Sequence, residues 1–333
     1  MGVKSFVVKI SPGLSALPQN VRMPTTGVVF PPRSDPSTLV PFARRVEELG
    51  FASLWVVEDC FLAGGLTMAA TALAVTERLH VGVGLMPVPL RNPALAAMEI
   101  GALARLHPGR FTAVLGHGVP AWMQQVGSLP RRRMAALGET VGAIRALLAG
   151  ETVSVDGAWV HLDAVALEPA PQLAPPVLIG STGPRGLAMA GEIADGFLVP
   201  EGSTPGFLAD CLAHARAGRS LGPAPLHGVA YLWLAVDDDA ERGRERLRPA
   251  VESWLGSIMA PAMYAAAGLG DRRLPPGPIP EALASELAAC GSPQACAQAV
   301  WRRHAEGIDE VVLWTVAGPG EDPLDDYARF AGG

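Results

Sequence analysis

The sequence predicts a closed (β/α)₈ barrel, and three observations support this fold class. Short β-branched runs alternate with longer helical patterns along almost all of the 333 residues, as expected for βα units on a parallel sheet. Eight such runs occur, and the 38 Gly and 31 Pro residues recur at regular intervals along the chain, which indicates many short connections. The main alternative is a doubly wound open sheet. The predicted strands are Thr26–Phe30, Ser53–Val57, His80–Leu85, Phe111–Leu115, Pro176–Gly180, Gly196–Val199, Val229–Val236 and Glu310–Thr315.

Helical patterns fill the intervals between the predicted strands. The first has an apolar stripe at helical spacing and Gly50 as a stop signal. Two stretches are not accounted for by the eight βα units, and we expect them to be insertions at the C-terminal face of the barrel. One, at 151–167, contains Asp156-Gly157 and reads as a hairpin, and the other spans 237–280. Residues 1–25 form an extension, and we treat 1–333 as one domain. The stripe consists of Leu39, Phe42, Ala43, Val46 and Leu49.

Composition excludes several classes of function. The net charge of −6 and the pI of about 5.7 argue against nucleic acid or an anionic membrane as a partner. No apolar stretch reaches the roughly 18 residues of a membrane helix, and no export signal is recognisable, so we expect a cytoplasmic protein. The four cysteines lack the spacing of metal ligands and are expected to be reduced.

In a barrel of this kind, the residues just after each strand build the active site. Glu58, Asp59 and Cys60 follow the second strand, and the acids are either helix caps or a carboxylate at the barrel mouth that exchanges a proton. Gly84 ends the third strand, where it is either part of a plain turn or allows a flat ligand to approach the backbone. Phe61 and Met86 lie close to these two strand ends.

The fourth predicted strand leads into Gly116 and His117. An imidazole at a strand end between glycines is a candidate general acid or hydrogen-bond donor, although a lone histidine is often structural. Trp122 and Met123 follow and could form an apolar wall over a ring system or belong to the core.

The sharpest local signal follows the fifth predicted strand, where Gly180–Pro184 reads GSTGP and opens a helix. Unpaired N–H groups at a helix start, together with the Ser181 and Thr182 hydroxyls, favour an anion site, most simply for a phosphate. An ordinary helix cap is the alternative. The turn lacks the Gly-Lys-Ser/Thr ending of a Walker sequence, and no G-x-G-x-x-G fingerprint follows the first strand.

Taken together, five ordered segments resemble the bacterial luciferase-like superfamily of flavin and deazaflavin oxidoreductases, whose fold is a (β/α)₈ barrel. The resemblance covers nearly the whole chain from about Thr26. The segments are RRVEELGFASLWVVED, RLHVGVGLMPVPLRNPALAAMEIGALARLHPGRFTAVLGHG, ETVGAIRALLAGETVSVDGAWVHL, PVLIGSTGPRGLAMAGEIADGFLV and GSPQACAQAVWRRHAEGIDEVVL. Within the superfamily, GPRGLAMAGEIADG is more similar to the branch that uses coenzyme F420 than to the monooxygenases that use flavin mononucleotide (FMN).

The resemblance implies a site for the chain. It implies a non-prolyl cis peptide behind the coenzyme ring at Gly84-Leu85. The candidates for proton transfer are Glu58, Asp59 and His117, with His117 preferred as the acid if the reaction runs as a reduction. In many deazaflavin relatives an acid and a histidine follow the second strand, and here both positions are acids. The implied cofactor-binding residues are Gly84, Leu85, Gly116, His117, Gly180, Ser181, Thr182, Gly183, Pro184 and Arg185, and the implied substrate-binding residues are Trp122, Met86 and Phe61.

The reaction implied by the resemblance is hydride transfer between coenzyme F420 and an organic substrate, with reduction of an activated C=C or C=N bond favoured. The alternative is an FMN-dependent monooxygenase that receives reduced flavin from a partner reductase. A non-catalytic relative of the barrel is a third reading, disfavoured by the retained phosphate turn. Glucose 6-phosphate oxidation is doubtful, because the acid expected after the fourth strand is missing and no lysine follows Lys9. We expect a neutral small-molecule or small-peptide substrate and a homodimer.

Overall fold

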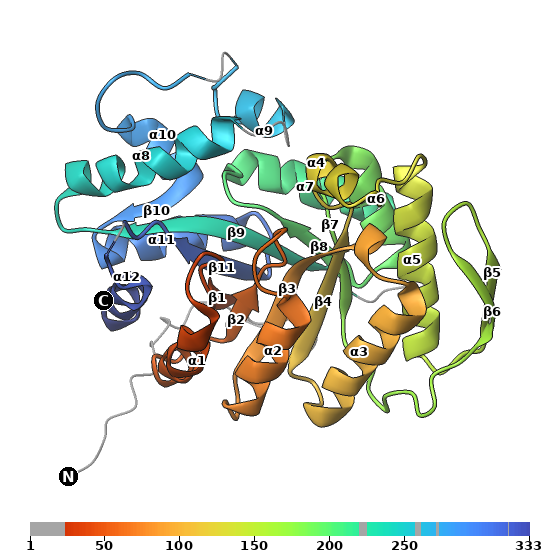
Figure 1. The fold of residues 1–333 in the computed structure, drawn as a ribbon. Coiled ribbons are helices and arrows are strands. Elements are labelled where there is room, and N and C mark those ends of the chain that lie inside the picture. The colour runs from red at the N-terminus through yellow and green to blue at the C-terminus, as the bar shows by residue number, and fades with distance from the viewer. Residues whose placement is uncertain (1–23, 220–224, 257–260, 271–272, 319) are drawn as a thin grey trace, which may run out of the picture.

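A closed ring of eight parallel strands forms the centre of the structure, a computed structural model that describes residues 24–219, 225–256, 261–270, 273–318 and 320–333 (Figure 1). The predicted 1–25 extension lies almost wholly outside this range. Pairing of β8 with β9 and of β11 with β1 closes the ring, which confirms the predicted (β/α)₈ barrel. In ring order the strands are β1 (Thr25–Val29), β2 (Ser53–Val56), β3 (His80–Pro87), β4 (Phe111–Gly116), β7 (Val177–Gly180), β8 (Gly196–Val199), β9 (His227–Val236) and β11 (Glu310–Thr315).

The barrel strands are buried on both faces, which explains why they read as continuous apolar runs. Side chains such as Trp55, Leu198 and Tyr231 fill the interior of the barrel as one cluster. A larger cluster lies between the outer face of the sheet and the surrounding helices. The interior is therefore a packed core, and a ligand has room only at an end of the barrel.

Helices surround the ring as the sequence predicts. In α1, Leu39, Phe42, Ala43 and Val46 are buried, and Gly50 follows with a φ of 82°, which favours glycine. The helices around the barrel are α1 (Leu39–Glu48), α2 (Gly65–Ala74), α3 (Pro93–Leu106), α5 (Arg133–Leu148), α6 (Pro184–Ile193), α7 (Pro205–Ala217), α11 (Pro293–Ala305) and α12 (Pro323–Gly332). Shorter pieces are η1 (Pro36–Thr38), η2 (Val88–Leu90) and α4 (Pro120–Gln125). No helix among the described residues is long and apolar enough to cross a membrane.

The predicted hairpin is present as β5 (Val153–Asp156) and β6 (His161–Val165), but its position corrects the expectation of an insertion at the C-terminal face. It connects the end of α5 to β7, so it leaves the barrel at the opposite face and runs back along the outside of α5 (Figure 1). Glu139 of α5 fixes it there by accepting hydrogen bonds from the N–H groups of Ala158, Trp159 and Val160 at 2.9–3.0 Å.

The second insertion follows β9 and therefore does start at the C-terminal face. It contains α8 (Ala240–Gly256), α9 (Pro261–Ala266), α10 (Glu281–Leu287) and β10 (Ala288–Gly291), and Figure 1 shows its helices together at one end of the barrel. β9 is long enough to pair with β8 through its first half and with β10 through its second. β10 was not predicted, because its sequence, AACG, contains no β-branched or aromatic residue.

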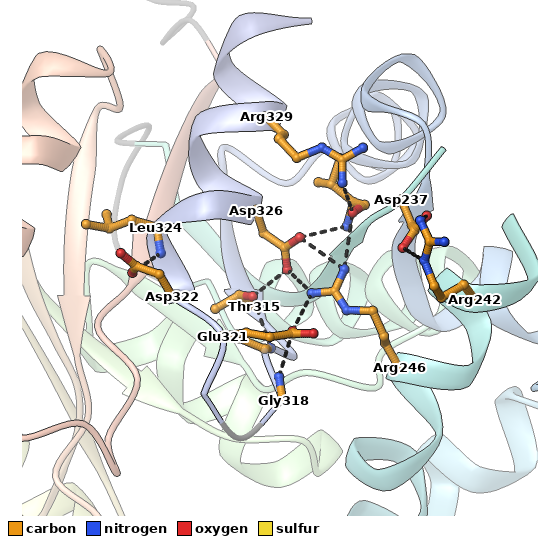
Figure 2. Close-up of polar contacts among 12 residues, drawn as sticks. Asp237, Arg242, Arg246, Thr315, Gly318, Glu321, Asp322, Leu324, Asp326 and Arg329 are labelled. Atoms are coloured by element: carbon orange, nitrogen blue, oxygen red, sulfur yellow. Dashed lines mark hydrogen bonds and ion pairs between the residues drawn. The ribbon is translucent and has the colours of Figure 1, made fainter. Parts of the chain in front are cut away.

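Arginine–carboxylate contacts clamp this insertion to the barrel (Figure 2). Arg246 of α8 donates to Asp326 of α12 at 2.8 Å and to the carbonyl oxygen of Val236, the last residue of β9, at 3.1 Å. Asp326 is 4% exposed and also accepts from the Thr315 hydroxyl of β11 at 2.6 Å. One buried carboxylate therefore joins α8 and α12 to the C-terminal ends of β9 and β11.

Candidate active site

The ends of β2, β3, β4, β7 and β8 bring most of the predicted site residues to one end of the barrel. Val57 and Leu198 belong to the interior cluster, and Asp59 and Glu201 follow them along the chain. The carboxyl groups of these two acids are close enough to interact electrostatically. The mouth of the barrel therefore has an acidic layer directly above an apolar interior.

The backbone at the end of β3 is shaped by glycine. The Gly84-Leu85 peptide is cis, as predicted, and Tyr231 inside the barrel donates a hydrogen bond from its hydroxyl to the Gly84 carbonyl oxygen at 2.9 Å. A Cβ on Gly84 would lie 2.3 Å from that hydroxyl oxygen. The Leu85 side chain extends across the mouth, where Cβ atoms on Gly116 and Gly180 would lie within 2.6 Å of it. The ends of β4 and β7 thus approach the Leu85 side chain more closely than any residue other than glycine allows.

The turn between β7 and α6 has the properties of an anion site. Gly183 is the N-cap residue of α6, and no side chain caps the helix, in contrast to α7 and α11, which Thr204 and Ser292 cap. Pro184 is the first residue of the helix. A Cβ on Gly183 would have no atom within 4 Å, so the space in front of this turn is open. An open, uncapped helix start offers N–H groups to an anion such as phosphate.

Glu58 serves the scaffold, which speaks against the proton-transfer role considered for it. One of its oxygens accepts from the N–H of Gly65 at the start of α2, at 3.0 Å, and the carboxylate is paired with Arg91 through both of its oxygens. The side chain is only 9% exposed. Arg91 therefore holds this carboxylate in place as the N-terminal cap of α2.

Asp59 and Glu201 are the two acids whose pKa values the mouth perturbs upward. Burial raises the pKa of Asp59, against the opposing charge of Arg33. Burial, together with the nearby charge of Asp59, raises the pKa of Glu201 from 4.5 to about 7. Trp254 of α8 packs against the next residue, Gly202, where its ring lies 2.4 Å from the position of a Cβ. Glu201 thus titrates close to neutral pH, well above the range of an ordinary glutamate.

Sequence reasoning missed Glu201, although a signal was present. The residue follows β8 at the segment PEG, where an acid just past a buried strand meets the same criterion that singled out Glu58 and Asp59. The burial that raises its pKa is not visible in the local sequence.

His117 lies half-buried at the end of β4. Burial and the positive charge of Arg133 lower its pKa, so the imidazole is neutral at pH 7 and suits a hydrogen-bond donor or a proton acceptor better than a cationic acid. The residues predicted to form an apolar surface at the mouth differ in their exposure. Trp122 is partly exposed and Phe61 is 64% exposed, whereas Met86 is 2% exposed and packs between sheet and helices. Met86 is thus a core residue, and Met123 is likewise fully buried.

Comparisons with known proteins identify the family. Residues 12–310 match the family model described as luciferase-like monooxygenase, so the chain belongs to this family. It is 24% identical over 323 residues to a 5,10-methylenetetrahydromethanopterin reductase of Methanolobus tindarius, covering 90% of this chain and 96% of the relative. It is 29% identical over 236 residues to an F420-dependent glucose-6-phosphate dehydrogenase of Nakamurella multipartita, covering 64% of this chain and 68% of the relative.

A solved structure agrees with the fold. An F420-dependent secondary alcohol dehydrogenase in complex with an F420-acetone adduct superposes with a TM-score of 0.77 at 20% identity, over 93% of this chain and 98% of that one. The family resemblance drawn from the five sequence segments is therefore confirmed. At this level of identity the structural likeness supports the barrel and leaves the substrate open.

Proposed function

We propose that the protein is an oxidoreductase that binds coenzyme F420 and transfers a hydride between this deazaflavin and a neutral organic substrate, favouring reduction of an activated C=C or C=N bond. The observation that carries the proposal is the pairing of two features at one barrel end. The cis Gly84-Leu85 peptide and its Leu85 side chain, which packs closely against Gly116 and Gly180, form an apolar surface that suits a flat ring, and the open, uncapped start of α6 suits a phosphate. The F420-dependent activity named for relatives of the chain supports the same cofactor.

Each part of the mouth has a separate task in this proposal. The start of α6 beside the Gly180–Pro184 turn holds the coenzyme phosphate; within the turn, Ser181 and Gly183 already donate their N–H groups to Leu198 and to the Ser181 hydroxyl. The Gly84-Leu85 peptide supports the ring, with Tyr231 donating to the Gly84 carbonyl oxygen at 2.9 Å. When bound, the deazaflavin supplies a ring carbon that gives or accepts a hydride. The protein has to bind, orient and exclude water from the reactants and to exchange one proton.

Glu201 is the best-suited group for that proton. With a pKa of about 7, its carboxyl group is about half protonated at pH 7, and it lies at the mouth near Asp59, so it can donate a proton to a substrate atom as the neighbouring carbon is reduced and recover the proton from solvent. Asp59 stabilises the protonated form of Glu201 through its negative charge. His117, whose pKa is lowered by burial and by Arg133, orients the substrate through a hydrogen bond from its neutral imidazole.

Binding titrations of the purified protein with oxidised F420 and, separately, with FMN test the cofactor, with intrinsic tryptophan fluorescence as the signal. Tight binding of F420 and weak binding of FMN supports hydride transfer. The opposite preference moves the assignment to an FMN-dependent monooxygenase, a reaction class that the family description, luciferase-like monooxygenase, includes. If neither binds, the cofactor assignment is wrong.

A pair of variants tests the phosphate turn. Gly183 has no neighbour within 4 Å of a new Cβ and a φ of −96°, so Gly183→Asp and Gly183→Asn should both fold and cap α6. The two side chains have nearly the same shape and differ in charge. We expect Gly183→Asp to weaken F420 binding at least tenfold more than Gly183→Asn, since its carboxylate repels a phosphate. Equal affinities for the two variants would place the phosphate elsewhere.

A further inference from the structure

The apolar cluster inside the barrel is incompletely covered at the C-terminal end of the strands. In the described part of the chain, Leu85 of β3 and Trp314 of β11 are the partly buried side chains that pack against this cluster. Val312 precedes Trp314 on the same face of β11 and is fully buried. Because β11 runs toward the C-terminal end of the barrel, the exposed part of Trp314 faces the candidate active site.

Trp314 and Leu85 lie on different sides of the mouth. β1 and β2 separate β11 from β3 in the ring of strands. Tyr231 lies between the two side chains, because its ring centroid is 5.8 Å from that of Trp314 and its hydroxyl donates to the Gly84 carbonyl oxygen at 2.9 Å. Since the coenzyme ring is assigned to the Gly84-Leu85 peptide, Trp314 is left on the side of the mouth that is available to a substrate.

The indole of Trp314 is not used by the scaffold in the way that its neighbours are. Trp55, deeper in the barrel, donates from Nε1 to the Glu310 carboxylate at 2.8 Å. Trp233, which is paired with Trp314 across β9 and β11, is 4% exposed and packs edge to face against Trp254 of α8. The N–H of Trp314 forms no hydrogen bond with any residue that the structure describes, and its nitrogen is not among the buried unpaired atoms. Its ring edge is therefore accessible to a ligand.

We propose that Trp314 determines the substrate specificity of this site: its indole contacts the substrate and selects one whose activated double bond is conjugated with a flat ring. The inference rests on the proposed function and deepens it, since it names the side chain that selects the substrate class. An aromatic pair contributes binding energy beyond the burial of its area, and an aliphatic substituent lacks this contribution. Asp59 and Glu201 at the same mouth repel an anionic substrate, which leaves an uncharged aromatic compound as the better match.

The test uses two unsaturated ketones that share the reacting group and differ in one substituent. Benzylideneacetone carries a phenyl ring where ethylideneacetone carries a methyl group. Each is titrated into the protein loaded with oxidised F420, which has no hydride to give, and the fluorescence of the bound coenzyme reports binding at the mouth.

Four variants are compared with the wild type. Trp314→Leu and Trp314→Met remove the aromatic ring, whereas Trp314→Phe retains one. Trp301→Leu is the matched control, because Trp301 lies on α11 outside the barrel and is 65% exposed. Thermal unfolding of each variant confirms that it is folded, and a titration with F420 confirms that the coenzyme still binds.

We expect the wild type to bind benzylideneacetone roughly tenfold more tightly than ethylideneacetone, as for one aromatic contact. Trp314→Leu and Trp314→Met should reduce this preference to about threefold or less, while Trp314→Phe keeps most of it and Trp301→Leu keeps all of it. The affinity for F420 should stay within about twofold throughout.

A wild type that holds F420 but binds the two ketones equally, or binds neither, overturns the proposal. The same conclusion follows if the preference survives in Trp314→Leu or Trp314→Met, or if it is lost equally in Trp301→Leu. If the wild type does not bind F420, the proposed function itself fails, and the assignment of Trp314 fails with it.

Discussion

Replacing Glu201 by glutamine removes a titrating group and leaves its shape nearly unchanged. The pKa of this carboxyl group is raised from 4.5 to about 7, first by burial and then by the charge of Asp59. Between these two pH values the folded protein holds a proton that the unfolded chain has released. The free energy of unfolding of the wild type therefore falls as the pH rises through this window, and the whole penalty is present above pH 7.

The size of the effect follows from the shift. A difference of about 2.5 pKa units at about 1.36 kcal/mol per unit gives about 3 kcal/mol. This is an upper bound, because the side chain of Glu201 retains partial contact with solvent. Glu201→Gln mimics the neutral acid, so its stability should match the wild type near pH 4.5 and exceed it at pH 7.5 by up to this amount.

Urea unfolding at pH steps from 4.5 to 8 measures this difference, with Glu151→Gln as the matched control on an exposed glutamate. If the difference between wild type and Glu201→Gln stays constant within about 0.5 kcal/mol across the range, Glu201 is ionised in the folded protein and its proton-donor role is refuted. Asp59→Asn provides a second check, since removing the neighbouring charge should shift the wild-type decline to lower pH.

Three further substitutions test how the scaffold holds the site. Gly84→Ala should lower the free energy of unfolding, measured with urea, by at least about 2 kcal/mol and weaken coenzyme binding, because the new methyl group meets the Tyr231 hydroxyl. The control Gly142→Ala places its methyl group in open space within a helix and should raise the free energy of unfolding by up to about 1 kcal/mol. Arg246→Ala should lower the free energy of unfolding by about 3 kcal/mol and increase proteolysis within the α8 insertion, because the buried Asp326 carboxylate loses its cation. Unchanged stability would show that this ion pair does not hold the insertion to the barrel. Glu310→Gln should lower the free energy of unfolding by about 2 kcal/mol near pH 7 and by progressively less below pH 4.5. The reason is that burial raises the pKa of Glu310 but its hydrogen bonds lower it by more, so the folded protein holds an ionised carboxylate. A cost that does not change with pH would show that Glu310 is not ionised.

The sequence predicted the barrel well because the relevant signals are local. Each buried strand is a short β-branched run bounded by glycine, proline or a helix start, and eight alternations leave few other topologies. The order of strands and helices then fixes which residues follow a strand and meet at one end. This is why Asp59, His117 and the Gly180–Pro184 turn were found together without any distance information.

What the sequence could not provide were the partners that residues acquire from distant parts of the chain. β10 forms only because β9 extends past β8 and leaves an edge to pair with. Trp254, which belongs to the second insertion, packs against Gly202 beside Glu201 in the loop after β8, and nothing in the local sequence predicts this contact. The hairpin was recognised correctly but assigned to the wrong face, since its turn residues specify a hairpin and not the end of the barrel from which it departs.

The two adjacent acids after β2 have different roles: Glu58 stabilises the fold, and Asp59 belongs to the proposed active site. Successive residues of an extended chain point in opposite directions, so Glu58 and Asp59 face different environments. Glu58 turns toward α2 and meets Arg91, which neutralises its charge and fixes the helix start. Asp59 lies at the mouth, where its charge acts on Glu201. The Arg91-paired Glu58 holds the start of α2, whereas the charge of Asp59 adds to the burial that raises the pKa of Glu201 to about 7.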